Sequence, residues 1–325
     1  MAIGRISTNQ YFKINTERMS KQQSDLVKIQ GQLATGQRVL KPSDDPLAMS
    51  VALGAKAGVK TIDSYQSNLT YVNNQLGQMD VALQSASDVM VTIKQSMLQA
   101  GNAAQSPSDR EILAQDLEGL LEELRGIANR TDANGDYMFS GTFQNQQPFQ
   151  VPGGAVTGAF LETATAADAQ AVKGREIQVS SGRFINLNIT GNDAFVDPAT
   201  NESAFEILGD AIALLRNPGF PNAQEGATPA DTFLKAFNSR MGQLDDVFDQ
   251  VQISRTKVGV RLREAETLGQ INQAAQLELE RVAGEAVGLD YAKAISELSQ
   301  GQLQLQAAQQ SFSSVSQLSL FNFLR

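Results

Sequence analysis

Two groups of acidic side chains in this sequence have a spacing that could support chemistry. Asp132, Asn134 and Asp136 alternate as in the first half of a calcium-binding loop, which offers carboxylate and amide oxygens to the ion. Such a loop needs glycine at its sixth position and glutamate at its twelfth, where this chain has Tyr137 and Phe143. The same residues are typical of a glycine turn with an Asx cap that leads into a strand, and we favour that interpretation.

The second group is the adjacent pair Asp44 and Asp45. Two carboxylates work as a catalytic acid and base only when they converge in a cleft, and neighbours in sequence rarely converge. Asp45 directly precedes Pro46, as an N-cap residue precedes a proline at the first helical position. The pair therefore predicts the start of a helix rather than an active site.

The composition also argues against catalysis. The 325 residues include no cysteine and no histidine, so thiol nucleophiles, thiolate metal sites, disulfides and imidazole bases are all excluded. The net charge of -9 gives no general attraction for nucleic acid or for an anionic membrane. There is no apolar run long enough to span a bilayer, and no apolar segment typical of a secretory signal. We expect no enzyme, no cofactor and no metal.

Both ends of the chain carry an apolar residue at every seventh position, the repeat of helices that supercoil against other helices. Small residues follow three places on in the C-terminal stripe, at Ala294, Gly301 and Ala308. Polar Asn15 and Gln22 stand where the N-terminal helix would need a second apolar row, so one helix alone buries little. We expect the two ends to pack together and to make contacts between subunits. The predicted assembly residues are Phe12, Met19, Leu26, Leu33, Tyr291, Leu298, Leu305 and Phe312.

The rest of the chain is mostly helical in pattern. Apolar residues spaced by seven run from Ile62 to Met97, and we interpret them as the core face of an intramolecular bundle. A short turn at Ser106-Pro107-Ser108 predicts that the next helix folds back as an antiparallel hairpin. The expected helices cover residues 8–35, a restart at 46, 62–97, 109–130, 202–216, 230 to beyond 262, and 291–324.

From residue 135 to 201 the chain is rich in Gly, Thr, Ala and Gln and carries short β-like runs, namely 137–139, 176–179 and 184–189. Because helices flank this insertion, the two halves of the chain must meet in space. The predicted fold class is mainly α, a long antiparallel helical bundle or coiled coil formed by the N- and C-terminal halves, with a small β-rich inserted outer domain. The predicted domains are a terminal coiled-coil region (1–40 plus 290–325), a helical rod domain (41–134 plus 202–289) and the outer domain (135–201).

Four segments resemble the flagellin-like family of flagellar axial proteins. Residues 5–10 (RISTNQ) are similar to the family's opening, 134–141 (NGDYMFSG) to its entry into the outer domain, and 303–324 to its C-terminal ending. Residues 32–46 (QLATGQRVLKPSDDP) closely resemble the "QLSTGKRI-PSDDP" signature of hook-associated protein 3, whereas filament flagellins usually carry "LSSG-RINSA-DDAAG". The residues that carry this distinction are Pro42, Ser43, Asp44, Asp45 and Pro46.

The resemblance implies a structural subunit of the extracellular bacterial flagellum, an adaptor at the hook–filament junction. It further implies export unfolded through the flagellar type III system and assembly into a ring or tube through the terminal helices. The implied partners are other copies of the chain, a neighbouring hook-associated protein, flagellin and a cytoplasmic export chaperone, without nucleic acid or membrane. Two alternatives stay open: the filament flagellin itself, or a secreted enzyme or adhesin whose activity lies on the insertion.

The stripes also suggest how assembly proceeds. In a free subunit the terminal segments have little to bury against, so we expect them to be largely disordered there. Docking into a tube removes their apolar surface from water, and at about 25 cal/mol per Å² a few hundred Å² per helix contributes several kcal/mol. Part of that free energy is offset by the entropy lost in ordering the chain.

Overall fold

The computed structural model describes residues 8–101, 106–141, 145, 147–149, 175–187, 189–216 and 229–323. The described residues are mostly helical, with a single two-stranded sheet among them, so the mainly α fold class predicted from the sequence is confirmed. The chain divides into two compact units, to which α2 (Pro46–Ala100) and α7 (Pro229–Val287) both contribute. Unit 1 comprises residues 1–62 with 273–325, and unit 2 comprises residues 63–272. The three-domain division stays a prediction.

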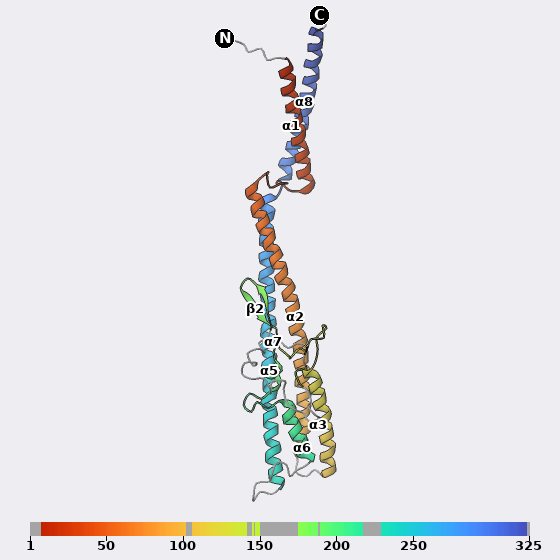
Figure 1. Ribbon diagram of the computed structural model, residues 1–325, viewed down its shortest axis with the longest axis vertical. Coiled ribbons are helices and arrows are strands. Elements are labelled where there is room, and N and C mark those ends of the chain that lie inside the picture. The colour runs from red at the N-terminus through yellow and green to blue at the C-terminus, as the bar shows by residue number, and fades with distance from the viewer. Residues whose placement is uncertain are drawn as a thin grey trace. The chain divides into compact units, whose positions relative to one another are not determined.

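Unit 1 brings the two ends of the chain together. Helices α1 (Thr8–Thr35) and α8 (Tyr291–Phe323) lie side by side in it (Figure 1). Their bounds agree with the helices predicted from the heptad stripes and from the stop at Gly36, which has a φ of 67°. The first turns of α2 and the last turns of α7 complete the unit.

Unit 2 has its core between α2 and α7. From Leu69 to Met97, the side chains spaced by seven along α2 belong to one buried cluster with the apolar face of α7. Polar contacts also join the helices, since Gln252 Nε2 donates to Ser87 Oγ at 2.7 Å and Lys94 lies 2.7 Å from Asp245. The predicted intramolecular role of this stripe is confirmed. The core includes Leu69, Leu76, Leu83, Met90 and Met97 of α2, and Phe237, Leu244, Val251 and Val258 of α7.

Helices α3 (Pro107–Ala128) and α6 (Ala204–Arg216) lie side by side in unit 2 (Figure 1). A capping box opens α3, because Ser106 Oγ accepts from the backbone N–H of Asp109 while the Asp109 carboxylate accepts from that of Ser106. The helix therefore starts two residues before the predicted position. On its apolar face Leu117, Leu121 and Leu124 are buried, and Leu120 is partly buried.

The described part of the insertion holds one hairpin, β1 (Glu176–Ser180) and β2 (Arg183–Asn186), in which Ile177 faces Ile185. The strand predicted at 176–179 is confirmed, and the one predicted at 184–189 ends at residue 186. The strand predicted at 137–139 is wrong, because the turn before it folds the chain back and leaves a single bridge to Thr131. Asn272 of α7 donates its Nδ2 to the carbonyl of Val179 at 2.8 Å, which holds the hairpin on that helix. Residues 150–174 of the predicted insertion lie outside the described residues.

Ahead of α6 comes a short helix, α5 (Gly191–Phe195), which fixes a cluster of aromatic rings. Phe195 packs against Phe139, Phe149 and Phe205 with ring centroids 5.3, 5.8 and 6.1 Å away. Gly191 leaves room for this cluster, because a Cβ there would lie 2.7 Å from the Phe149 ring. These contacts anchor the insertion's end in the core of unit 2.

Candidate assembly interface

The predicted stripes of α1 and α8 face each other in unit 1. The rings of Phe12 and Phe312 meet edge to face, with centroids 5.4 Å apart and an interplanar angle of 84°. Leu26 is buried against Gly301, where an added Cβ would lie only 2.8 Å from Leu26 Cδ2. Tyr291 is the exception, since its side chain is 53% exposed. The remaining stripe residues are half-buried, namely Met19, Leu33, Leu298 and Leu305.

Among the described side chains of these helices, several apolar ones face away from the seam. Val27 is 66% exposed, Leu303 67%, Ile295 54% and Ile14 37%, although none lies on a predicted stripe. Sequence reasoning missed them because it searched for periodicity, whereas their signal is an apolar side chain on an otherwise polar helix face. Such residues are available for contacts beyond the pair.

The two helices differ sharply in charge. Six charged residues lie along α1, whereas the sequence carries no charge between Leu298 and Leu324 in α8. Between Leu298 and Ser314, where side chains are described, the exposed surface of α8 consists largely of glutamine and serine side chains. A surface without ions can approach another protein surface without the cost of desolvating a charge.

The connectors at the base of the seam bind each other, and together we call them the clasp: residues 36–46 and 286–290. The backbone N–H of Arg38 donates to the carbonyl of Val287 at 2.7 Å, and that of Leu289 donates to the carbonyl of Gly36 at 3.1 Å. The Arg38 guanidinium donates to the carbonyl of Ala286, also at 3.1 Å. A small core beside these bonds buries Val39, Ala52 and Val287. The end of α1 and the start of α8 are thereby held together.

Asp45 caps α2 inside the clasp. Its Oδ1 accepts from the backbone N–H of Ala48 at 3.0 Å, so the N-cap predicted before Pro46 is confirmed. The Oδ2 atom accepts from the Arg38 guanidinium at 3.1 Å. The hydrogen bond from Ala48 and then the bond from Arg38 lower the pKa of this carboxyl below its ordinary value.

Asp44 braces the turn that contains Pro42 and Ser43. Its Oδ2 accepts from the backbone N–H groups of Leu40 and Lys41, at 3.2 and 3.1 Å. Lys28 of α1 donates to its Oδ1 at 2.8 Å. This ammonium is the main cause that lowers the pKa of Asp44, and the backbone bond from Lys41 adds to it. Each carboxylate therefore has its own hydrogen-bond partners, and together the two stabilise the clasp.

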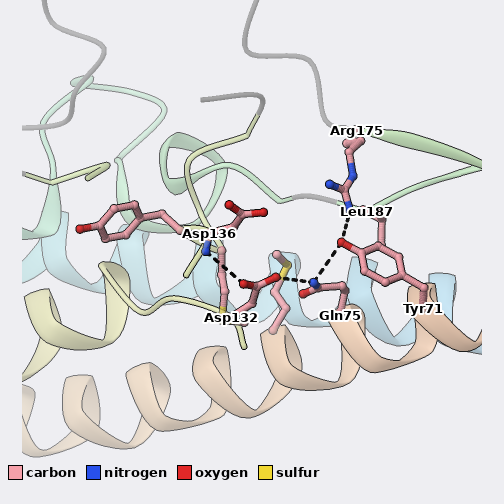
Figure 2. Close-up of a pocket in the computed structure, with 9 residues that line it drawn as sticks. Tyr71, Gln75, Asp132, Asp136, Arg175 and Leu187 are labelled. Carbon is pink, nitrogen blue, oxygen red and sulfur yellow. Dashed lines mark hydrogen bonds between the residues drawn. The ribbon is translucent and has the colours of Figure 1, made fainter. Parts of the chain in front are cut away.

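In unit 2 the Asp132 turn lines a small polar pocket (Figure 2). Asp132 Oδ1 accepts from the backbone N–H groups of Asn134 and Asp136, at 2.8 and 3.0 Å, which is the predicted Asx turn. Gln75 Nε2 donates to the other oxygen at 2.6 Å. Burial alone raises the pKa of Asp132, but the hydrogen bonds, that from Gln75 foremost, outweigh it and leave the pKa lowered.

Arg175 also lines this pocket, and its guanidinium carbon lies 5.1 Å from the centre of the Tyr71 ring (Figure 2). The cavity measures about 20 Å³, which is room for one water molecule. Throughout the described residues, no three acidic side chains are grouped so that they could hold a metal ion. Nor does any helix in the described ranges combine the length and apolarity needed to cross a membrane.

The sequence is similar to known proteins along nearly its whole length. The family model for the bacterial flagellin N-terminal helical region matches residues 6–144. Flagellar hook-associated protein 3 of Salmonella typhimurium is 28% identical over 325 residues, which cover 99% of this chain and 100% of the relative. The protein of the same name from Escherichia coli is 27% identical over 98% of each chain. The chain is a homologue of flagellar hook-associated protein 3.

Solved structures agree with the fold of hook-associated protein 3. A flagellar hook-associated protein from Vibrio parahaemolyticus superposes with a TM-score of 0.63 at 20% identity, over 75% of this chain and 100% of that one. The flagellar junction protein FlgL from Legionella pneumophila gives a TM-score of 0.56 at 16% identity, over 73% and 100%. The homologues are structural flagellar proteins, and hook-associated proteins belong to the extracellular flagellum.

Proposed function

We propose that this chain is the adaptor between hook and filament, and that it assembles into a ring or tube through its terminal helices. The observation that carries the proposal is the match to hook-associated protein 3 along nearly the whole of both chains. A shared terminal region alone would fit any member of the flagellin family, whereas this match includes the helices of unit 2 and the insertion. The activity is mechanical, and no catalytic step belongs to it.

The geometry of the terminal pair supports assembly as the step that completes its folding. Leu26 and Ala294 are the buried apolar residues of the seam among those described in α1 and α8, and the remaining stripe residues stay half-buried or exposed. Two isolated helices with so thin a seam are marginal in water. Neighbouring copies would cover the outer residues Val27, Ile295 and Leu303 and so stabilise the pair.

The partners we propose follow from this position in the flagellum. On one side lies a neighbouring hook-associated protein and on the other the first flagellin subunits, with other copies of this chain around the ring. We further propose export in an unfolded state through the type III system, with a cytoplasmic chaperone that covers the apolar stripe of α8. A chain without cysteine suits that route, because no disulfide can form before or after export.

The filament flagellin is the second candidate. Flagellin of Bacillus subtilis is 22% identical over 301 residues, which cover 91% of this chain and 91% of that protein. The two roles differ in the extent of polymerisation, because a flagellin grows into long filaments on its own and a junction adaptor stops at a short ring. Sedimentation of the purified chain after seeding with hook fragments separates them.

The experiment that tests the junction role is deletion of the gene in its own organism. The proposal expects cells that keep their hooks, lack filaments and release flagellin monomers into the medium, with filaments restored when the chain is supplied again. Cells that still carry full filaments after the deletion would contradict the junction role. Cells that have hooks but make no flagellin filament protein at all would identify the chain as the flagellin.

A further inference from the structure

The seam between α1 and α8 repeats every seven residues, so its apolar pattern alone fits more than one register. Large side chains recur at Phe12, Met19, Leu26 and Leu33, and small residues recur at Ala294, Gly301 and Ala308. Sliding one helix along the other by seven residues, about 10.5 Å, again places large side chains opposite small ones. Something beyond the stripe must choose between these registers.

Chain connectivity does not make that choice. The connector between α7 and α8 has three residues, 288–290, but the one between α1 and α2 has ten, 36–45. Ten extended residues reach up to about 33 Å, roughly three times the slide of one heptad. Without further contacts, α1 is therefore free to shift along α8 while both stay attached.

Two features of unit 1 remove this freedom. The clasp fixes the long connector, because Arg38 is bonded at once to Ala286, Val287 and Asp45. The seam adds a steric match, since Leu26 sits where Gly301 has no Cβ, and a methyl group at this place would lie 2.8 Å from Leu26 Cδ2. A slide by one heptad would bring Leu26 onto an alanine instead and would also break the clasp.

We propose that the clasp and the contact between Leu26 and Gly301 are the register-determining device of the terminal helix pair. The clasp holds the base of the pair, and Gly301 selects the alignment in which Leu26 meets the one residue of the small-residue series that has no Cβ. Pairing of α1 with α8 then starts at the clasp and continues toward the chain ends in a single register. This role concerns the pair within one chain and holds whichever flagellar position the assembled protein takes.

Cross-linking reads the register directly, because the native chain has no cysteine. We would prepare three full-length double variants and treat each with a short bismaleimide, followed by mass spectrometry of the linked peptides. The native register is reported by F12C/F312C, whose parent rings touch in the structure. Slides by one heptad in either direction are reported by F12C/L305C and M19C/F312C. A bismaleimide also links thiols that meet in unpaired chains, so the three variants are treated at the same concentration and time, and the excess of one product over the others reports the register.

Without further substitutions, we expect a high yield of linked product from F12C/F312C. The yields from F12C/L305C and M19C/F312C should be far lower. Adding G301A or R38A/D45A should lower the native product and produce a slipped one. Arg281 provides the matched control, because R281A removes a guanidinium that pairs with Glu278 and Glu285 on the same unit without touching the clasp. It should leave the native product exclusive.

Equal yields of native and slipped products in the unchanged chain would overturn the proposal. So would an exclusive native product in both G301A and R38A/D45A. If the clasp variant yields no linked product because its helices separate, G301A decides, since that variant keeps every clasp hydrogen bond. Circular dichroism of each variant confirms that unit 2 stays folded.

Discussion

Replacing Leu305 by aspartate tests whether the terminal seam drives assembly. A fully buried leucine contributes about 1.5–3 kcal/mol, so the half-buried Leu305 contributes roughly 1 kcal/mol to the seam. The new carboxylate would also be partly desolvated between two helices, which adds a further cost. A total near 1.4 kcal/mol weakens pairing about tenfold. Because the seam buries few apolar residues, a tenfold weaker pairing should leave few subunits with paired terminal helices that can dock.

The assay compares Leu305→Asp with Leu303→Asp, which lies two residues away on the outer face of the same helix. Both variants should be soluble, with urea unfolding of unit 2 unchanged, because neither residue belongs to its core. Leu305→Asp should abolish filament growth on the hook and weaken the α1–α8 pair, whereas Leu303→Asp should leave the pair intact. Normal motility and filament length in the Leu305→Asp strain would refute the role of the seam.

Three further outcomes follow from the described contacts. Gly191→Ala should lower the free energy of unfolding by about 1–3 kcal/mol through overpacking against the Phe149 ring, and Phe149→Leu should relieve this in a urea double-mutant cycle. The pKa values of Asp44 and Asp45 are lowered in the folded chain, so both carboxylates stabilise the clasp fully above the ordinary aspartate pKa of about 3.9. This stabilisation is lost as the pH falls through their lower folded-state pKa values. Protection of the clasp amides against exchange, measured across that pH range, should decrease as the pH falls. Asn201 has a φ of 61°, so its replacement by alanine should cost about 1–2 kcal/mol in the same unfolding assay while glycine is tolerated.

Periodic features of this chain could be predicted from its sequence, because residues that recur at the period of a helix lie on the same face of that helix. The apolar stripes that begin at Phe12 and end at Phe312 predicted both terminal helices and the contact between them. Local capping chemistry was equally readable at Asp45 and in the Asp132 turn, since each side chain bonds to backbone within four residues. These features depend on neighbours in sequence and need no knowledge of the tertiary fold.

The clasp could not be predicted in the same way. Arg38 and Val287 are joined by backbone hydrogen bonding across most of the chain, and no repeat or motif links the two positions. The predicted strand at residues 137–139 failed for a related reason, because the preceding turn pairs Tyr137 with Thr131 and so ends any longer strand. The outward-facing Leu303 was missed because a single apolar residue off the stripe has no periodic signal.

Hydrogen exchange of the free and the assembled chain tests most directly whether neighbouring copies complete the terminal seam. In the free subunit, amides of residues 1–35 and 295–325 should exchange fast while those around Leu76, in the core of unit 2, exchange slowly. In the assembly that we propose, the terminal amides should become slow as well. Uniformly slow exchange along the whole free chain, unchanged on assembly, would contradict the account.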